Sequence, residues 1–184
     1  MVMHRRYEEE RVQVGKRLIA AGVLILYCVL FTGCGYRFSG GGSFPAGIKS
    51  VFVEIFENHT SETGIEQKFT NDLIYEITRN GSVNFAGRES ADGIISGVIV
   101  SSGTETVSPR GVTAASERRV RVRVDLKLTL SDGKVVWSAK GVTVNEAYQV
   151  ALTNQQTEEN KREAIDKISE KLAESVLNRL TSDF

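Results

Sequence analysis

The sequence is poor in the residues that small catalytic and metal-binding sites need. It has two cysteines and two histidines among 184 residues, and its formal net charge is zero. A zinc or other transition-metal site needs several Cys, His or carboxylate side chains at ligand spacing, and no such grouping occurs. A glycine-rich phosphate loop and a serine at a nucleophile elbow are also missing. These absences argue against an enzyme, a metal and a cofactor, and the balanced charge argues against a nucleic-acid binder.

Long apolar runs are also scarce. The longest, Leu18–Leu30, falls short of the roughly 20 residues that a membrane-spanning helix needs. Lys16 and Arg17 precede this run, and the small pair Thr32-Gly33 follows it. A cationic start, a short apolar stretch and small residues before a cleavage point are typical of a secretory signal peptide. We therefore predict a signal peptide over residues 1–33.

The residue that follows the predicted cleavage point is Cys34. The segment Leu30-Phe31-Thr32-Gly33-Cys34 resembles a bacterial lipobox, in which the cysteine is lipidated and becomes the mature N-terminus. Cys28 would be lost with the leader, so Cys34 would have no partner for an internal disulfide. We predict Cys34 as the lipid-attachment site, residues 34–47 as the lipidated cysteine and a flexible glycine-rich tether, and residues 48–184 as a single domain.

Two stretches have the apolar period of an amphipathic helix. The first opens at a capping box formed by Thr63 and Glu66, and it stops at Asn80-Gly81. The second is capped by Thr157, with two glutamates in its first turn. The predicted apolar stripes are Ile65, Phe69, Leu73 and Ile77 in the first helix, and Ile165, Ile168, Leu172, Val176 and Leu180 in the second.

Extended segments account for most of the remaining chain. They are predicted at Val51–Phe56, Val83–Phe85, Gly93–Ser101, Arg119–Leu130 and Val135–Val150. Asp132-Gly133 is a hairpin signal, because both central positions of a two-residue turn favour positive φ. Two amphipathic helices need an apolar surface, and strands with one apolar face supply it. We predict a two-layer α+β sandwich, with two helices packed on a mixed, mostly antiparallel sheet of about four strands.

A polar segment with Pro109-Arg110-Gly111 at its middle joins two of the predicted strands. We predict a loop over Thr104–Ala115, and two interpretations are open: a hairpin connection, or a recognition loop that becomes ordered on a partner. His59, in another polar loop, is predicted to be a solvated side chain, because a lone loop histidine is a poor candidate for a base or a ligand.

Basic side chains alternate with apolar ones along the clearest predicted strand. Arg119, Arg121 and Arg123 point to one side, each about 7 Å from the next, and Lys127 extends the row. Like charges in a row repel one another unless carboxylates or a ligand offset them. Two interpretations are therefore open. The row is either a solvated face paired with acids on a neighbouring strand, or an anion-binding face for a phosphorylated lipid or an acidic partner.

Taken in order along the chain, several short motifs together resemble the LptE family of lipopolysaccharide-assembly lipoproteins. Each motif is short, so the resemblance depends on their order over nearly the whole mature chain. The motifs are Cys34-Gly35-Tyr36, Phe44-Pro45, Ile48-Lys49-Ser50-Val51, Phe56-Glu57-Asn58-His59-Thr60, Thr63-Gly64-Ile65-Glu66, Ala147-Tyr148 and Asn178-Arg179-Leu180.

The resemblance implies a non-enzymatic protein at the cell outer membrane. Members of the family are lipid-anchored on its periplasmic side and sit as a plug inside the LptD β-barrel. They help the barrel to assemble and assist delivery of lipopolysaccharide to the cell surface. Some members bind lipopolysaccharide through basic side chains, and by analogy the binding residues here are Arg119, Arg121, Arg123 and Lys127.

A second resemblance belongs to another class of protein. Phe56-Glu57-Asn58-His59-Thr60 also looks like the opening of periplasmic accessory domains, such as those of TolB-like and curli-secretion lipoproteins. That alternative implies an envelope adaptor or a secretion component without a lipopolysaccharide site. A stable ring of identical subunits would favour secretion, whereas a monomer that needs a barrel would favour the plug.

Overall fold

The computed structural model describes residues 44–107 and 117–182. The predicted leader, Cys34 and most of the predicted tether lie outside the described residues. The elements are η1 (Pro45–Gly47), β1 (Ser50–Val53), β2 (Glu57–Asn58), α2 (Ile65–Asn80), β3 (Asn84–Phe85), β4 (Gly93–Val107), β5 (Glu117–Leu130), β6 (Val135–Gln149) and α3 (Asn154–Ser182). In this part of the chain, neither helix is long and apolar enough to cross a membrane.

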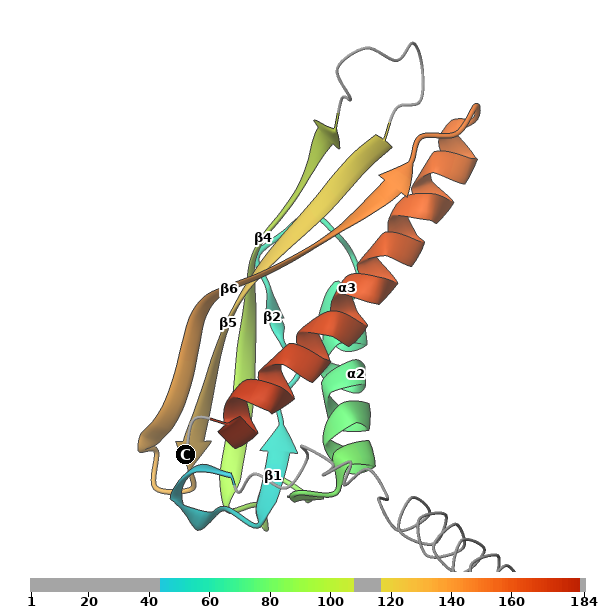
Figure 1. Cartoon of the computed structure of the whole chain (residues 1–184). Coiled ribbons are helices and arrows are strands. Elements are labelled where there is room, and N and C mark those ends of the chain that lie inside the picture. Colours follow the sequence, from blue (N-terminus) through green and yellow to red (C-terminus); the bar gives the residue numbers. More distant parts are fainter. Residues whose placement is uncertain (1–43, 108–116, 183–184) are drawn as a thin grey trace, which may run out of the picture. The chain divides into compact units, whose positions relative to one another are not determined.

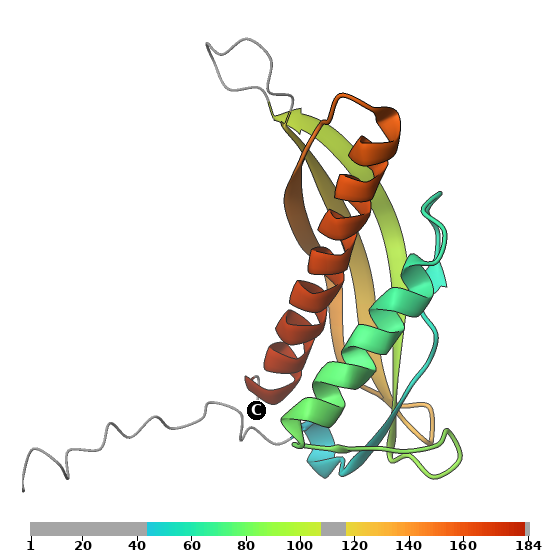
Figure 2. The ribbon, with the colours of Figure 1, turned by 90° about the vertical axis from the view of Figure 1, so that its right-hand side faces the viewer.

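The strands form one mixed sheet in the order β3-β1-β4-β5-β6, and β2 pairs with β4 beyond the end of β1. The three long strands β4, β5 and β6 are antiparallel, whereas β1 and β2 run parallel to β4. Both helices cover the same face of the sheet (Figures 1 and 2). The predicted α+β sandwich is confirmed, with six strands in place of about four. Two of the six strands, β2 and β3, are only two residues long.

The hydrophobic core lies between the sheet and the helices. Alternate residues of β5 from Val120 to Leu128 are buried, as the period of two predicts. The predicted stripes of both helices are buried as well. Phe44 and Pro45, at the end of the predicted tether, are buried with this core. Burying one such large apolar side chain contributes about 1.5–3 kcal/mol, so the buried side chains of this interface stabilise the packing of the two layers.

The predicted strand Val51–Phe56 ends early, at Val53. Ile55 is 67% exposed, whereas Phe56 turns back into the core. The Phe56 ring lies directly over Gly97 of β4, where a Cβ atom would be 2.7 Å from the ring. The Phe56 N–H donates to Thr70 Oγ1 at 3.0 Å. The strand therefore breaks because one aromatic ring fits a gap over a glycine that lies far away in the sequence.

The start of each helix differs from the prediction. Helix α2 begins after Gly64, which has φ 83° and no side-chain capping bond, and Glu66 instead accepts a hydrogen bond from Asn58 Nδ2 at 2.9 Å. Helix α3 begins at Asn154, where Thr153 Oγ1 accepts the Gln156 N–H at 3.2 Å. The capping box and the Thr157 cap were both wrong. The predicted stop of α2 is confirmed, since Gly81 has φ 68°.

Two connections of β5 also differ in detail. Asp132-Gly133 does form the hairpin turn to β6, but only Gly133 has positive φ, so the loop is the three-residue type with glycine in the left-handed position. Strand β4 continues to Val107, opposite Glu117. The first part of the predicted loop Thr104–Ala115 is therefore a strand, because Thr104, Thr106 and Val107 favour extended backbone and pair with β5. Residues 108–116 lie outside the described residues.

Asp92 connects the start of β4 to the start of β1. Its Oδ2 accepts hydrogen bonds from the backbone N–H groups of Lys49 and Ser50, at 3.1 and 2.9 Å, and from Ser50 Oγ at 2.9 Å. In return, the Asp92 N–H donates to Ser50 Oγ at 3.0 Å. These bonds hold the pKa of the Asp92 carboxyl below its ordinary value, with the Ser50 hydroxyl as the largest cause. Asp92 therefore fixes the parallel pair β1–β4 at one end.

Candidate functional site

The arginine row, by which we mean Arg119, Arg121, Arg123 and Lys127, lies on the face of β5 that points away from the helices. The residues between its members, from Val120 to Leu126, alternate into the core. This placement confirms that the basic side chains share one face. The same face is uncovered within the described residues, because both helices pack on the opposite side of the sheet (Figure 2).

One carboxylate on the neighbouring strand β4 lies close to two of the arginines. Glu105 lies directly opposite Arg119, and its Oε1 accepts a hydrogen bond from Arg121 Nη2 at 3.0 Å. The distance from the same oxygen to Arg119 Nη1 is 3.9 Å. Since these side chains are about half exposed, each pair contributes only about 0–1 kcal/mol. The interpretation as a solvated face with acids alongside therefore holds for Arg119 and Arg121.

Arg123 and Lys127 have different surroundings. Within residues 44–107 and 117–182, neither forms an ion pair. On β4, Arg123 lies opposite Ser101 and Lys127 opposite Ser96. On β6, their neighbours are Thr143 and Ser138. On the neighbouring strands these two cations are flanked by small neutral side chains. Asp125 lies between them on β5, and its Oδ1 accepts the Gly141 N–H. Both cations are exposed, so their donors are accessible to an external anion.

A β-bulge in β4 creates this arrangement. Before Ile99, the even-numbered residues of β4 share the outer face with β5 residues such as Lys127, whereas after Ser101 the odd-numbered residues do. The extra residue, Val100, produces the switch. It brings Ser101, Gly103 and Glu105 to the outer face beside the arginines. Without the bulge, Val100, Ser102 and Thr104 would lie opposite Arg123, Arg121 and Arg119, and Glu105 would point to the other face.

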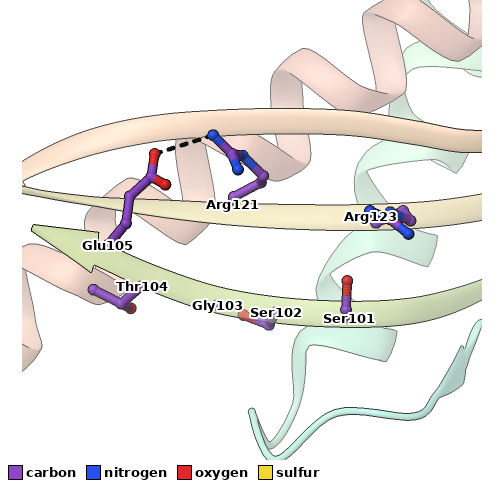
Figure 3. Close-up of a pocket in the computed structure, with 7 residues that line it drawn as sticks. All are labelled: Ser101, Ser102, Gly103, Thr104, Glu105, Arg121 and Arg123. Atoms are coloured by element: carbon purple, nitrogen blue, oxygen red, sulfur yellow. Dashed lines mark hydrogen bonds and ion pairs between the residues drawn. The ribbon is translucent and has the colours of Figure 1, made fainter.

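The small residues leave a shallow depression of about 240 Å³ beside the arginines. In Figure 3, Ser101 and Glu105 point to the same side of the sheet as Arg123 and Arg121. The lining residues are Ser101, Ser102, Gly103, Thr104, Glu105, Arg121 and Arg123. Guanidinium groups present paired donors that match phosphate and carboxylate oxygens. The depression can therefore hold an anionic group against Arg123, with Arg121 shared between that group and Glu105.

The other residues considered in the sequence do not form a reactive site. His59 is exposed and lies 3.5 Å from the Glu57 carboxylate, as expected for a solvated loop histidine. In the part of the chain that the structure describes, His, Cys, Asp and Glu side chains do not gather in any group able to hold a metal ion. The arginine row, with its depression, is the strongest candidate for a functional site.

Comparison with solved structures identifies the fold. A minor lipoprotein from Acinetobacter baumannii superimposes with a TM-score of 0.51 at 14% identity, over 73% of this chain and 92% of that one. A homologue of a neuraminyllactose-binding hemagglutinin from Helicobacter pylori gives a TM-score of 0.51 at 11% identity, over 80% of this chain and 90% of that one. At these identities the likeness concerns the fold alone. No curated protein matches the sequence.

Comparison with protein families goes further than the fold. Residues 48–180 match the family described as "LptE: Lipopolysaccharide-assembly". The match covers both helices and all strands of the sheet from β1 to β6. This agrees with the resemblance found in the short motifs. The chain belongs to the LptE family of non-enzymatic lipopolysaccharide-assembly lipoproteins.

Proposed function

We propose that this protein is an outer-membrane lipoprotein that plugs the lumen of an LptD-type β-barrel. In this role it assists assembly of the barrel and delivery of lipopolysaccharide to the cell surface. Membership of the LptE family supports the role in lipopolysaccharide assembly. The observation that carries the binding role is the arginine row, which is exposed on the uncovered face of the sheet and incompletely neutralised by Glu105. The lumen of such a barrel is polar, which suits a domain with charged outer faces.

The membrane anchor in this proposal is a lipid on Cys34, attached after removal of residues 1–33. Phe44, the first residue that the structure describes, is buried, and in this proposal Gly35–Ser43 would form the connection to the lipid. Fully extended, this connection reaches about 30 Å. A single acyl chain binds a membrane only reversibly, whereas two or more anchor stably. The proposed anchor thus keeps the domain at the periplasmic side of the outer membrane.

The proposed ligand groups are the phosphates of lipopolysaccharide. Arg123 and Lys127 lack carboxylate partners among the described residues, and Arg121 can exchange Glu105 for a phosphate. Charge-assisted hydrogen bonds from guanidinium groups to phosphate are roughly twice as strong as neutral ones. Arginines about 7 Å apart along β5, with Lys127 about twice that distance from Arg123, can meet several phosphates along one molecule. Binding should therefore weaken as salt concentration rises.

The test uses the full chain with a C-terminal tag, co-expressed with the LptD-type barrel of the same organism. The first readout is recovery of the barrel in a one-to-one complex, and the second is titration of the purified protein with lipopolysaccharide. We expect Arg121→Glu/Arg123→Glu to weaken lipopolysaccharide binding while leaving the fold intact. The matched control Arg162→Glu/Lys167→Glu makes the same charge change on exposed positions of α3 and should bind normally.

Two results would contradict the proposal. Equal lipopolysaccharide affinity in both double variants would remove the arginine row from the binding role. Recovery of copies of this chain alone, as a stable ring without a barrel, would instead favour the secretion-accessory function.

A further inference from the structure

The distal part of β4, Ser101–Val107, forms an open sheet edge. Strand β1 pairs with β4 only up to Ile95, and β2 pairs with it only up to Ile99. Among the described residues, no strand lies beside β4 beyond that point (Figure 1). Most side chains of Ser101–Val107 are exposed as well. Within residues 44–107 and 117–182, this segment is thus paired with β5 alone, and its backbone groups on the other side have no strand partner.

The hydrogen-bond pattern identifies which residues face the open edge. Leu130 N–H donates to Lys134 O across the β5–β6 hairpin, so the even-numbered residues of β5 bond to β6 and the odd-numbered ones to β4. Beyond the bulge, odd-numbered β5 residues pair with odd-numbered β4 residues, as in Arg121 with Gly103. The backbone N–H and C=O groups of Ser102, Thr104 and Thr106 therefore point outward at the edge.

Beyond the bulge at Val100, the described part of this edge has none of the usual features that prevent strand addition. Natural edges are blocked by lysine, proline, bulges or a covering element. The opposite edge of the sheet, β6, has Lys140 and a bulge at Gly141, whose N–H donates to Asp125 Oδ1 at 2.6 Å. By contrast, Ser102–Val107 is a regular run of Ser, Gly, Thr, Glu, Thr and Val. The free backbone groups of this regular segment can therefore pair with another strand.

The positive charge of the arginine row favours an added strand that carries an acidic side chain. A strand added beside β4 would place its outward side chains next to Ser101 and Gly103, which are too small to separate it from the arginines of β5. Arg123, without an ion pair among the described residues, lies one strand spacing of about 4.8 Å further in. A carboxylate on the added strand would be within its reach.

We infer that the β4 edge at Ser102, Thr104 and Thr106 binds an extended segment of the barrel partner, which adds a strand to the sheet and places a carboxylate against Arg123, where it competes with a lipopolysaccharide phosphate. This inference rests on the proposed function. The strands of a closed barrel have no free edge, so the segment comes from a loop or terminus of the barrel protein. Backbone hydrogen bonds provide affinity in this mode of binding, and the side chains provide specificity.

The test compares Thr106→Pro with Thr106→Ala in the full chain, co-expressed with the barrel, because Thr106 faces the open edge and does not line the depression beside the arginines. Proline removes an edge-facing N–H but no β4–β5 hydrogen bond, whereas alanine keeps the N–H. We expect recovery of the barrel to fall about tenfold with proline, the effect of about 1.4 kcal/mol, and to change little with alanine. Both variants should bind lipopolysaccharide as the unmodified protein does.

A photo-crosslinking amino acid at Ser102 provides a second measurement that does not require the proline variant to fold. We expect it to crosslink to one barrel segment that contains Asp or Glu, and the same group at Asn145 on β6 should not reach that segment. Equal barrel recovery with proline and alanine, or crosslinks scattered over the barrel, would overturn the inference and leave the plug proposal intact. Failure of the unmodified chain to recover any barrel would overturn both.

Discussion

Glu105 on β4 accepts a hydrogen bond from Arg121 on β5 at 3.0 Å, diagonally across the strand pair. The carboxylate thus occupies the place beside the arginines that an external anion would take. Arg119, directly opposite Glu105, is 3.9 Å from the same oxygen. Glu105 therefore acts as an internal competitor for any phosphate that binds to this face.

Replacing Glu105 with glutamine should strengthen lipopolysaccharide binding. The change frees Arg121 and removes a negative charge from the depression. Since an exposed ion pair contributes about 0.2–1 kcal/mol, we expect a gain of about two- to fivefold in affinity at low salt. Titration with lipopolysaccharide measures the effect, with Glu163→Gln on α3 as a charge-matched control. Unchanged or weaker binding in Glu105→Gln would show that phosphate groups do not bind beside Arg121.

Replacing Gly97 with alanine should destabilise the fold. The new methyl group would lie 2.7–2.8 Å from three carbon atoms of the buried Phe56 ring. Such overpacking costs about 1–3 kcal/mol in free energy of unfolding, which urea denaturation can measure. Gly103→Ala is the control, since no atom lies within 4 Å of its Cβ position. Adding Phe56→Leu to Gly97→Ala should recover part of the loss, and a purely additive double variant would contradict this account.

Replacing Thr70 with valine should leave the Phe56 N–H without an acceptor. Thr70 Oγ1 accepts that N–H at 3.0 Å and donates to Glu66 O at 2.7 Å, and Thr70 is buried. An unsatisfied buried donor costs about 1–3 kcal/mol. Thr70→Ser should retain most of the stability because it keeps the hydroxyl. Thr78→Val, at an exposed position of the same helix, serves as a control. Equal unfolding midpoints for Thr70→Val and Thr78→Val would argue against the bond to Phe56.

Stability should depend on pH through Asp92. Its folded-state pKa is lowered, first by the Ser50 hydroxyl and then by the Lys49 N–H. A carboxyl group with a lowered folded-state pKa stabilises the fold above its unfolded pKa, here near the ordinary value of 3.8, and this contribution is lost as the pH falls through the folded-state value.

The variant Asp92→Asn isolates this effect from the other carboxyl groups. We expect it to unfold at a lower temperature than the unmodified protein at neutral pH, and the gap should narrow as the pH falls below 3.8. Thermal unfolding at several pH values provides the measurement. A gap that stays constant over this range would mean that ionisation of Asp92 does not stabilise the β1–β4 pair.

Local periodicity in the sequence determined the two helices, the long strands and the basic face of β5. Val120, Val122 and Val124 alternate with arginines, and any sheet that buries the valines must expose the arginines. The stripes of α2 and α3 predict their buried faces for the same reason. Gly81 and Gly133 mark chain reversals, because their backbone conformation is required locally and does not depend on distant contacts.

The tertiary structure decided the features that depend on residues far apart in the sequence. The bulge at Val100 sets which β4 residues meet the arginines, and it cannot be read from either strand alone. The Phe56 ring ends β1 because it meets Gly97, and Asn58 engages Glu66 in place of a capping box. Periodicity assigns each side chain to a face, but strand register assigns its neighbours, and neighbours determine the charge and the open edge of this site.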